Sequence, residues 1–422
     1  MKKAILLTVL MNFILFNILF AQVTPSINLV KKDLPILGQQ ARSQFIYDYF
    51  ASPANLYIVG NKDNSYFVAY LNESSKFIHI ISLTSLDVIK AETIIKSVGT
   101  TNQLVGFTRN TKSGNFYLAY LKDNKHGDKD NELHIAMVDG TGNLVAKSLI
   151  FGDKNNGELW SKGTPTAWST CKLMYNEALN KVAFFVGHTM RWDDNVRHQA
   201  SYFGLMDENC KQLMMDEKNP TGNTWFCSHD FEQRLIAVDS MFYTLSQGDF
   251  YPRALVFAGW KLDGKTCYSN KPYKEYYSIP KTDMYQDTKT ETGGLIALKN
   301  GTFGIVYGSF HERKNKDLKY VNIDKKGDIV GEIWLTQLND YSATCPKIAR
   351  FNDNILIAWQ ADTELDASYF RVIDKNGKTI IKDQKEENVR LFYHNDLYQL
   401  ANNQIIWAEI IDKNLRIYKI TP

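Results

Sequence analysis

The feature that most constrains the fold is a pattern that recurs seven times along the chain. Each copy holds a β-rich run, a polar tip, a second β-rich run, a turn rich in Gly, Asn and Asp, and a third run. The copies start 50 to 66 residues apart, at Tyr66, Phe116, Val182, Phe242, Phe303, Ile355 and Ile405. A further short run precedes each start, such as CKLMYN before Val182. Each unit is therefore predicted to form a four-stranded antiparallel sheet.

A four-stranded sheet of this size cannot bury both of its faces alone. Seven such sheets arranged radially cover one another, and closure of the ring hides their edges. The sequence therefore predicts an all-β fold, a seven-bladed β-propeller. The last copy stops after its third strand, so residues 22–50 are expected to supply the missing outer strand. Two β-sandwich domains are the alternative, although no linker lies near the middle of the chain.

The first 21 residues are predicted to be a secretory signal peptide. Lys2 and Lys3 precede an apolar run from Ala4 to Phe20, and Ala21 suits a cleavage site. An uncleaved anchor helix is the alternative, but the run is slightly short for a span. No later stretch is long and apolar enough to cross a membrane. We expect residues 22–422 to form a single propeller domain, secreted or periplasmic, monomeric and without a membrane span.

Charge and cysteine content exclude two classes of protein. The chain has 49 Lys and Arg against 46 Asp and Glu, a net charge of +3. This balance gives no electrostatic reason to expect a nucleic-acid partner. Five cysteines in 422 residues are too few for a disulfide scaffold. Their pairing cannot be read from the sequence, and the odd number leaves at least one outside any intramolecular pair.

Propeller topology sorts the polar residues onto two rims. The tips between second and third strands share one rim with the crossings between blades, whereas the short turns on the other rim look ordinary. Loops on a rigid scaffold are where binding and chemistry concentrate. His79 and His134 lie elsewhere, but the other six histidines fall on the crossing rim, at His126, His188, His198, His229, His311 and His394. The polar residues are densest on blades 3 and 4.

The residue types on this rim suit β-elimination on a uronic-acid polysaccharide. An arginine neutralises the uronate carboxylate and so acidifies the C5 proton, which a histidine or tyrosine removes. A second histidine or tyrosine protonates the leaving glycosidic oxygen. No cofactor is required. The chain has no G-x-S-x-G or HExxH motif, so neither a serine-nucleophile elbow nor a zinc-protease helix is expected.

Four segments of blades 3 and 4 carry a resemblance to a known family. They are GHT with His188, RHQ with His198, CSHDF with His229, and GDFYPR with Tyr251 and Arg253. In this order, over about 70 residues, they resemble the propeller-type ulvan lyases, which cleave a sulfated rhamnose–uronic acid polymer. The resemblance implies that Arg253 binds the carboxylate, His198 or Tyr251 is the base and His188 is the acid.

Other residues complete the predicted site. Tyr243, on a strand of blade 4, competes with Tyr251 for the tyrosine role. Contacts to an anionic polysaccharide are expected from the side chains that surround the catalytic set, namely Arg191, Trp192, Arg197, His229, Asp249 and His311.

Three alternatives stay open at this point. Cys227 and His229 supply two candidate metal ligands, so a structural Zn²⁺ is one of them, and Asp193 with Asp194 offers a Ca²⁺ site. A non-catalytic propeller that binds extracellular glycan or protein is the second, because propellers host unrelated functions. A hydrolase that uses paired rim carboxylates is the third.

Overall fold

The computed structural model describes most of the chain after the predicted signal peptide. The described residues are 26–40, 55–123, 131–151, 170–191, 197–213, 224–225, 232–247, 255–261, 273–275 and 290–421. The backbone alone is described at 123, 131, 188–191, 197–200, 224–225, 261 and 273–275. Within these ranges no helix is long and apolar enough to cross a membrane.

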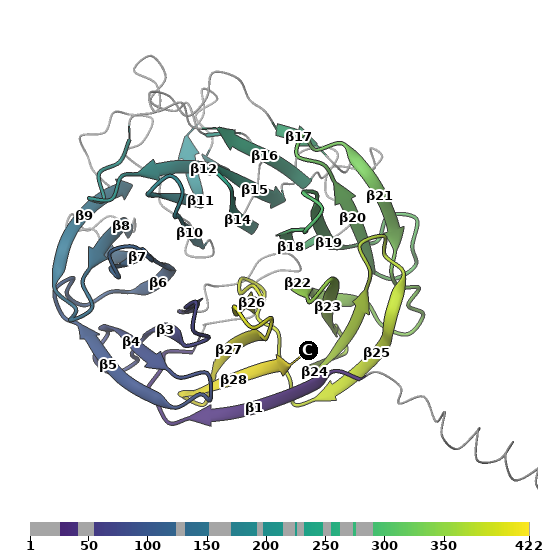
Figure 1. Cartoon of the computed structure of the whole chain (residues 1–422), viewed down its shortest axis with the longest axis horizontal. Helices are drawn as coiled ribbons and strands as arrows, with labels where there is room; N and C mark the ends of the chain where they lie inside the picture. The colour runs from purple at the N-terminus through teal and green to yellow at the C-terminus, as the bar shows by residue number, and fades with distance from the viewer. Residues whose placement is uncertain are drawn as a thin grey trace, which may run out of the picture.

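Seven four-stranded antiparallel sheets surround a central axis (Figure 1), which confirms the predicted seven-bladed propeller. From the innermost strand outward, the first four blades are β2 (Leu56–Gly60), β3 (Tyr66–Leu71), β4 (Ile78–Leu83) and β5 (Ile89–Ile95); β6 (Gln103–Arg109), β7 (Phe116–Asp123), β8 (Asn131–Val138) and β9 (Leu144–Phe151); β10 (Cys171–Asn176), β11 (Lys181–Arg191), β12 (Arg197–Met206) and β13 (Thr224–Trp225); and β14 (Glu232–Val238), β15 (Met241–Gln247), β16 (Leu255–Lys261) and β17 (Tyr273–Glu275). The other three are β18 (Glu291–Ala297), β19 (Phe303–Ser309), β20 (Asp317–Ile323) and β21 (Ile329–Trp334); β22 (Ala343–Phe351), β23 (Asn354–Ala361), β24 (Glu364–Ile373) and β25 (Thr379–Glu387); and β26 (Tyr398–Gln399), β27 (Ile405–Ile411), β28 (Asn414–Thr421) and β1 (Asn28–Leu34).

The ring is closed by the first strand of the chain. β1 pairs antiparallel with β28 from Asn28 opposite Thr421 to Leu34 opposite Leu415. Arg416 also binds Asp33 across this ladder, with Nε 2.6 Å from Oδ1 and Nη2 2.9 Å from Oδ2. The prediction that the N-terminal segment supplies the missing outer strand of the seventh blade is confirmed.

The hydrophobic core lies between the blades. The described residues form seven buried clusters, and each combines side chains from two neighbouring blades, so the ring has one cluster for each of its seven interfaces. Between blades 3 and 4, Phe203 stacks on Trp260 with ring centroids 4.4 Å apart. Outer strands such as β21 are largely exposed. No blade buries its apolar face alone, which is why the repeats must assemble together.

The repeated turns that separate third and fourth strands share one geometry. Gly142, Gly327 and Gly377 adopt positive φ angles of 88°, 84° and 87°. In each turn the glycine N–H donates to the carbonyl of an aspartate three residues earlier, at 3.0 Å. The left-handed region is open to glycine at little steric cost. These residues therefore fix the turns that the DGTGN, DKKGD and DKNGK segments predict.

Candidate functional site

The antiparallel topology defines the two rims of the molecule. The crossing rim carries the start of each innermost strand and the tips that join second to third strands, such as β11 to β12. The turn rim carries the connections that join innermost to second strands, such as β2 to β3. Of the predicted catalytic and binding residues that the structure describes, His188, Arg191, Arg197, His198 and His311 belong to the β11–β12 and β19–β20 tips of the crossing rim.

Two predicted catalytic positions lie on one hairpin of blade 3. β11 and β12 pair with His188 opposite Ala200 and Met190 opposite His198. Because paired residues share a face and alternate residues return to it, positions 188 and 198 are diagonal neighbours on the same face. Their Cα atoms are expected to lie about 7–8 Å apart. The register thus brings together the two histidine positions that the sequence pattern singled out.

The register places the two predicted binding arginines differently. Arg191 lies opposite Arg197 at the end of the same hairpin, one position out of phase with the histidines. Both arginine positions are therefore on the other face of the ladder. The remaining predicted residues of blades 3 and 4 lie outside the described part of the chain, namely Trp192, Cys227, His229, Asp249, Tyr251 and Arg253.

The competing tyrosine, Tyr243, is a core residue. It lies near the turn-rim end of β15, is 1% exposed and packs against Phe257 and Phe303. Its hydroxyl group donates to the sulfur atom of Met241 at 3.4 Å. Burial raises the pKa of this phenol above its usual value. Tyr243 therefore lies away from the crossing rim, and it is not a candidate for the base.

His311 lies where the sequence predicted, at the β19–β20 tip of blade 5. Its side chain is 20% exposed, and Nε2 lies 3.7 Å from Oε1 of Glu312. In the same tip the guanidinium of Arg313 lies over the ring of Trp334, 4.5 Å from its centroid. The crossing rim of blade 5 therefore carries an imidazole and a guanidinium group.

A buried group of charges occupies the centre of the crossing rim. This axial cluster comprises Lys172, Glu232, Arg234, Lys347, His394 and Asp396. Arg234, on β14 and 2% exposed, is its centre. Its Nη1 lies 3.2 Å from Oε2 of Glu232, and its Nε lies 3.0 Å from Oδ1 of Asp396. Nη2 donates to the Thr292 and Tyr393 carbonyls, so this guanidinium links three of the blades.

The other members of the axial cluster come from neighbouring blades. Lys172 of β10 bonds Asp396 Oδ2 at 2.8 Å and the His394 carbonyl at 2.7 Å. Lys347 of β22 donates to the Tyr393 carbonyl at 2.5 Å. His394 was predicted to be a rim histidine, but it is fully buried, and its Nδ1 lies 3.4 Å from Oε1 of Glu232. Three basic side chains, Lys172, Arg234 and Lys347, therefore face the carboxyl groups of Glu232 and Asp396.

Burial and neighbouring charges shift the pKa values of the axial cluster in opposite directions. Desolvation raises the pKa of Glu232 to about 8, although the nearby cations oppose this shift. Desolvation also lowers the pKa of Lys347 to about 8. Burial alone would raise the pKa of Asp396, but the charges of Lys172, Arg234 and Lys347 hold it at about 2. At neutral pH the axial cluster therefore carries a net positive charge.

The axial cluster opens into a channel along the propeller axis. Asp396 lines this internal space, and 45% of its side chain is exposed. The cavity has a volume of about 280 Å³ and runs along the innermost strands β2, β6 and β10. It adjoins a second cavity at the turn rim, of about 650 Å³, and Gly60, Arg109, Thr111 and Tyr398 line both.

The described part of the chain contains no metal site. No group of three or more His, Cys, Asp or Glu residues there could hold a metal ion. The predicted pair Cys227 and His229 lies outside this part, and so does the Asp193–Asp194 alternative. Cys171 and Cys210 are buried thiols, and burial raises the pKa of Cys210 to about 12.

Sequence reasoning missed most of the axial cluster. Lys172, Glu232, Arg234 and Lys347 all occupy innermost strands that otherwise look like ordinary sheet residues. The available signal was the presence of a charged side chain near the start of the innermost strand in blades 3, 4 and 6. Only the ring geometry brings these starts together around one axis (Figure 1).

The chain is similar in fold to several solved structures. No protein-family model matches the sequence, and a comparison with curated proteins finds no match. Hydrazine synthase of Kuenenia stuttgartiensis is 8% identical, with a TM-score of 0.52, over 87% of this chain and 96% of that one. A puromycin hydrolase structure is 9% identical, with a TM-score of 0.50, over 89% of this chain and 53% of that one.

A polysaccharide lyase, Uly1, is also among the structural matches. It is 10% identical, with a TM-score of 0.48, over 93% of this chain and 99% of that one. At such low identity, the two matches with a TM-score of 0.50 or more bear on the fold alone. One fold can host unrelated chemistries, so the case for function depends on the residues of this chain.

Proposed function

We propose that the protein cleaves a uronic-acid-containing, ulvan-like polysaccharide by β-elimination at the crossing rim. The observation that carries this proposal is the β11–β12 register, which sets His188 and His198 as diagonal neighbours on one face. Two histidine positions that are diagonal neighbours on one face of a hairpin are suited to act on one sugar unit as acid and base. The axial cluster supports the choice of an anionic substrate, because its net charge is positive at the centre of the same rim.

The proposed reaction needs only side chains of this chain. Arg253 neutralises the uronate carboxylate and so acidifies the C5–H bond. His198 or Tyr251 removes the C5 proton, and the electron pair forms the C4–C5 double bond as the C4–O bond breaks. His188 then donates a proton to the leaving glycosidic oxygen. The products are a chain with a new hydroxyl end and one with an unsaturated uronate end, and no cofactor is required.

The compartment belongs to the same proposal. Residues 1–21 have the pattern of a secretory signal peptide. Export would place residues 22–422 in the periplasm or outside the cell, where an algal or bacterial polysaccharide is accessible. A monomer is sufficient for this activity, because all the proposed catalytic positions belong to one chain.

The experiment follows the ultraviolet absorbance of the unsaturated uronate as the mature protein is incubated with a panel of polyuronates, ulvan first. His188→Gln and His198→Gln are each expected to lower kcat by about 10²–10⁴-fold, the usual contribution of a general acid or base. Gln199→Ala, on the other face of the same hairpin, is the matched control and should keep wild-type turnover.

Two outcomes would contradict the proposal. Wild-type turnover in both histidine variants would exclude the assigned acid and base. Absence of product from every polyuronate, with retention of the protein on an immobilised polysaccharide, would favour the non-catalytic glycan-binding alternative.

A further inference from the structure

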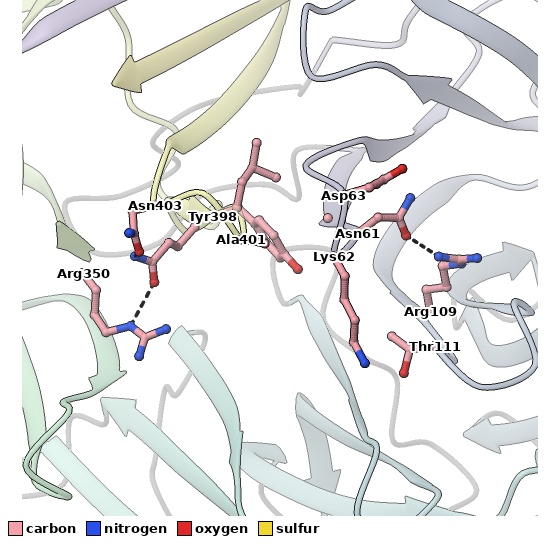
Figure 2. Close-up of a pocket in the computed structure, with 12 residues that line it drawn as sticks. Asn61, Lys62, Asp63, Arg109, Thr111, Arg350, Tyr398, Ala401 and Asn403 are labelled. Atoms are coloured by element: carbon pink, nitrogen blue, oxygen red, sulfur yellow. Dashed lines mark hydrogen bonds between the residues drawn. The ribbon is translucent and has the colours of Figure 1, made fainter. Parts of the chain in front are cut away.

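The turn rim holds a cavity that no motif of the sequence predicts. It lies at the mouth of the axial channel, has a volume of about 650 Å³ and is formed by the β2–β3, β6–β7 and β26–β27 turns with the end of β22. Figure 2 shows Lys62 and Arg109 on one side of this turn-rim cavity and Arg350 on the other. The cavity therefore presents cations from opposite sides.

The arginines of this cavity differ from the other arginines of the protein. Of those whose side chains the structure describes, five lie within 4.0 Å of a carboxylate oxygen, namely Arg234, Arg313, Arg371, Arg390 and Arg416. Arg109 and Arg350 are the two described arginines that do not, and both line the turn-rim cavity. Their charges are therefore left uncompensated at ion-pair distance within the described part of the chain.

Neutral groups hold both guanidinium groups in place. Arg109 donates to the side-chain oxygen of Asn61 and to the Gly114 carbonyl, and lies 4.9 Å from the centroid of the Phe67 ring. Arg350 Nε donates to Oε1 of Gln399 at 2.9 Å (Figure 2). These contacts orient the two cations without neutralising them, and the remaining N–H groups are the donors that suit carboxylate or sulfate oxygens.

The carboxylates closest to this mouth have other partners. Oδ1 of Asp63 accepts hydrogen bonds from the Ser65 amide at 3.0 Å and the Ser65 hydroxyl at 2.6 Å, which fixes the β2–β3 turn. Glu177 lies 3.4 Å from Lys62, but both side chains are at least half exposed. An exposed pair of this kind is readily screened and exchanged. The lining of the turn-rim cavity holds three cations, Lys62, Arg109 and Arg350, and one carboxylate, Asp63, so its net charge is positive.

The rest of the lining consists largely of polar neutral groups. Thr111, Gln399 and Asn403 offer hydroxyl and amide groups, and Tyr398 offers an aromatic surface. Gly60 lets this ring approach the backbone, since a Cβ atom there would lie 2.8 Å from Cε1 of Tyr398. Amides, hydroxyls and one aromatic ring are typical of sugar contacts. The volume falls within the range of about 300–1,000 Å³ of small-ligand sites.

We propose that the turn-rim cavity is a second binding site, which takes an acidic oligosaccharide of two or three sugars between Arg109 and Arg350. The carboxylate or sulfate groups of the ligand pair with the two guanidinium groups, and its hydroxyl groups bond the amides of Gln399 and Asn403. The site lies on the rim opposite His188 and His198, and the proposal does not depend on the reaction assigned there.

The test is calorimetric titration of the mature protein with trigalacturonate, with maltotriose as the neutral control and inorganic sulfate as the simple anion. We expect trigalacturonate to bind, and Arg109→Gln and Arg350→Gln each to weaken this binding about tenfold or more. Lys299→Gln is the control. Lys299 lies in another turn of the same rim, and its charge is already paired with Asp353. Polyuronate turnover is measured in parallel and is expected to be unchanged in both arginine variants.

The outcomes separate this site from the proposed reaction. Loss of a binding event in the arginine variants supports the turn-rim site whether or not the protein is a lyase. Unchanged binding in both variants overturns it, and so does equal binding of maltotriose or of sulfate alone. If Arg109→Gln lowers the melting temperature, Arg350→Gln and Lys62→Gln carry the test, because Lys62 is 83% exposed.

Discussion

The arginines of the two rims of the propeller differ in their partners. On the crossing rim, Arg234 is buried, contacts two carboxylates and donates to three backbone carbonyls of its own chain. On the turn rim, Arg109 and Arg350 bond neutral oxygens among the described residues, and both border an open cavity. The same residue type therefore serves the internal structure at one end of the axis and faces a cavity at the other.

This difference shows how position in the ring decides the role of a charge. A buried cation needs internal partners, because leaving it unpaired costs several kcal/mol. A cation at a cavity mouth is partly hydrated, so it can remain without a carboxylate until an anion arrives. We therefore expect substitutions in the axial cluster to affect mainly folding, and substitutions at the turn-rim cavity to affect mainly binding.

The largest expected effect comes from removing the central cation. Arg234→Met should lower the free energy of unfolding by about 3–5 kcal/mol, because it leaves Glu232 and Asp396 without their shared partner. Denaturant unfolding followed by tryptophan fluorescence measures this loss. Arg350→Met is the matched control on the other rim and should unfold at nearly the wild-type midpoint. Equal losses in the two variants would abolish the contrast between the rims.

The next effect is a pH dependence of stability. Burial raises the pKa of Glu232 from 4.5 to about 8, so the folded state binds this proton more tightly than the unfolded state. The free energy of unfolding should therefore fall as pH rises from about 4.5 to about 8 and recover none of this loss above that range. Glu232→Gln removes this carboxyl group, so the fall in the free energy of unfolding with rising pH should be smaller by about 2–4 kcal/mol.

This second prediction is measured as the difference between wild-type and Glu232→Gln unfolding at about pH 5 and about pH 9. Lys347 adds an opposite trend, because its depressed pKa raises stability as pH rises from about 8 to 10.5, and Glu232 is one of the charges that set this pKa. The fall between about pH 5 and about pH 8 is therefore the part of the difference that reports on Glu232 itself. A difference that does not change with pH would show that Glu232 is ionised throughout, and would contradict the raised pKa.

A smaller effect concerns salt. Raising the ionic strength from about 0.05 to 0.5 M should weaken anion binding at the turn-rim cavity several-fold, because exposed charges are screened. The stability difference between wild type and Arg234→Met should change little over the same range, because the charged groups of Arg234 and Glu232 are buried. Titration calorimetry and denaturant unfolding in the same buffers provide the two measurements. Salt-independent binding would indicate that the guanidinium groups do not contact the anion.

The smallest expected effect is on the exposed pair at the turn rim. Lys62→Gln should leave the unfolding midpoint within experimental error, because its ion pair with Glu177 is largely solvated. Its affinity for trigalacturonate should nevertheless fall, although by less than in Arg350→Gln. A clear loss of stability in Lys62→Gln would mean that charged side chains of the turn rim also stabilise the folded state.

The repeat pattern predicted the scaffold closely. The predicted start at Tyr66 is the first residue of β3, whereas Val182 lies one residue after the start of β11. Such agreement is possible because alternating apolar residues and Gly-containing turns are local signals. The role of residues 22–50 was also predictable, since a seventh blade with three strands needs a fourth.

The two charged regions were not predictable in the same way. Lys172 in CKLMYN and Lys347 in PKIARF read as ordinary strand residues, because nothing local shows that their strands meet at an axis. The turns around Asn61 and Asn403 were expected to be unremarkable, yet they border the turn-rim cavity. Both features depend on contacts between blades, and no single-strand pattern records those contacts.

The closure by β1 also governs when the molecule can become complete. Six sheets consist of strands that follow one another along the chain, so each can form soon after its own residues are synthesised. The seventh must wait, because Asn28 finds its partner only when Thr421 exists. Until then, the first-made strand and the last blade both present unpaired edges. A nascent chain therefore carries its greatest aggregation hazard until β28 has been added, and deleting β1 or β28 would make that hazard permanent.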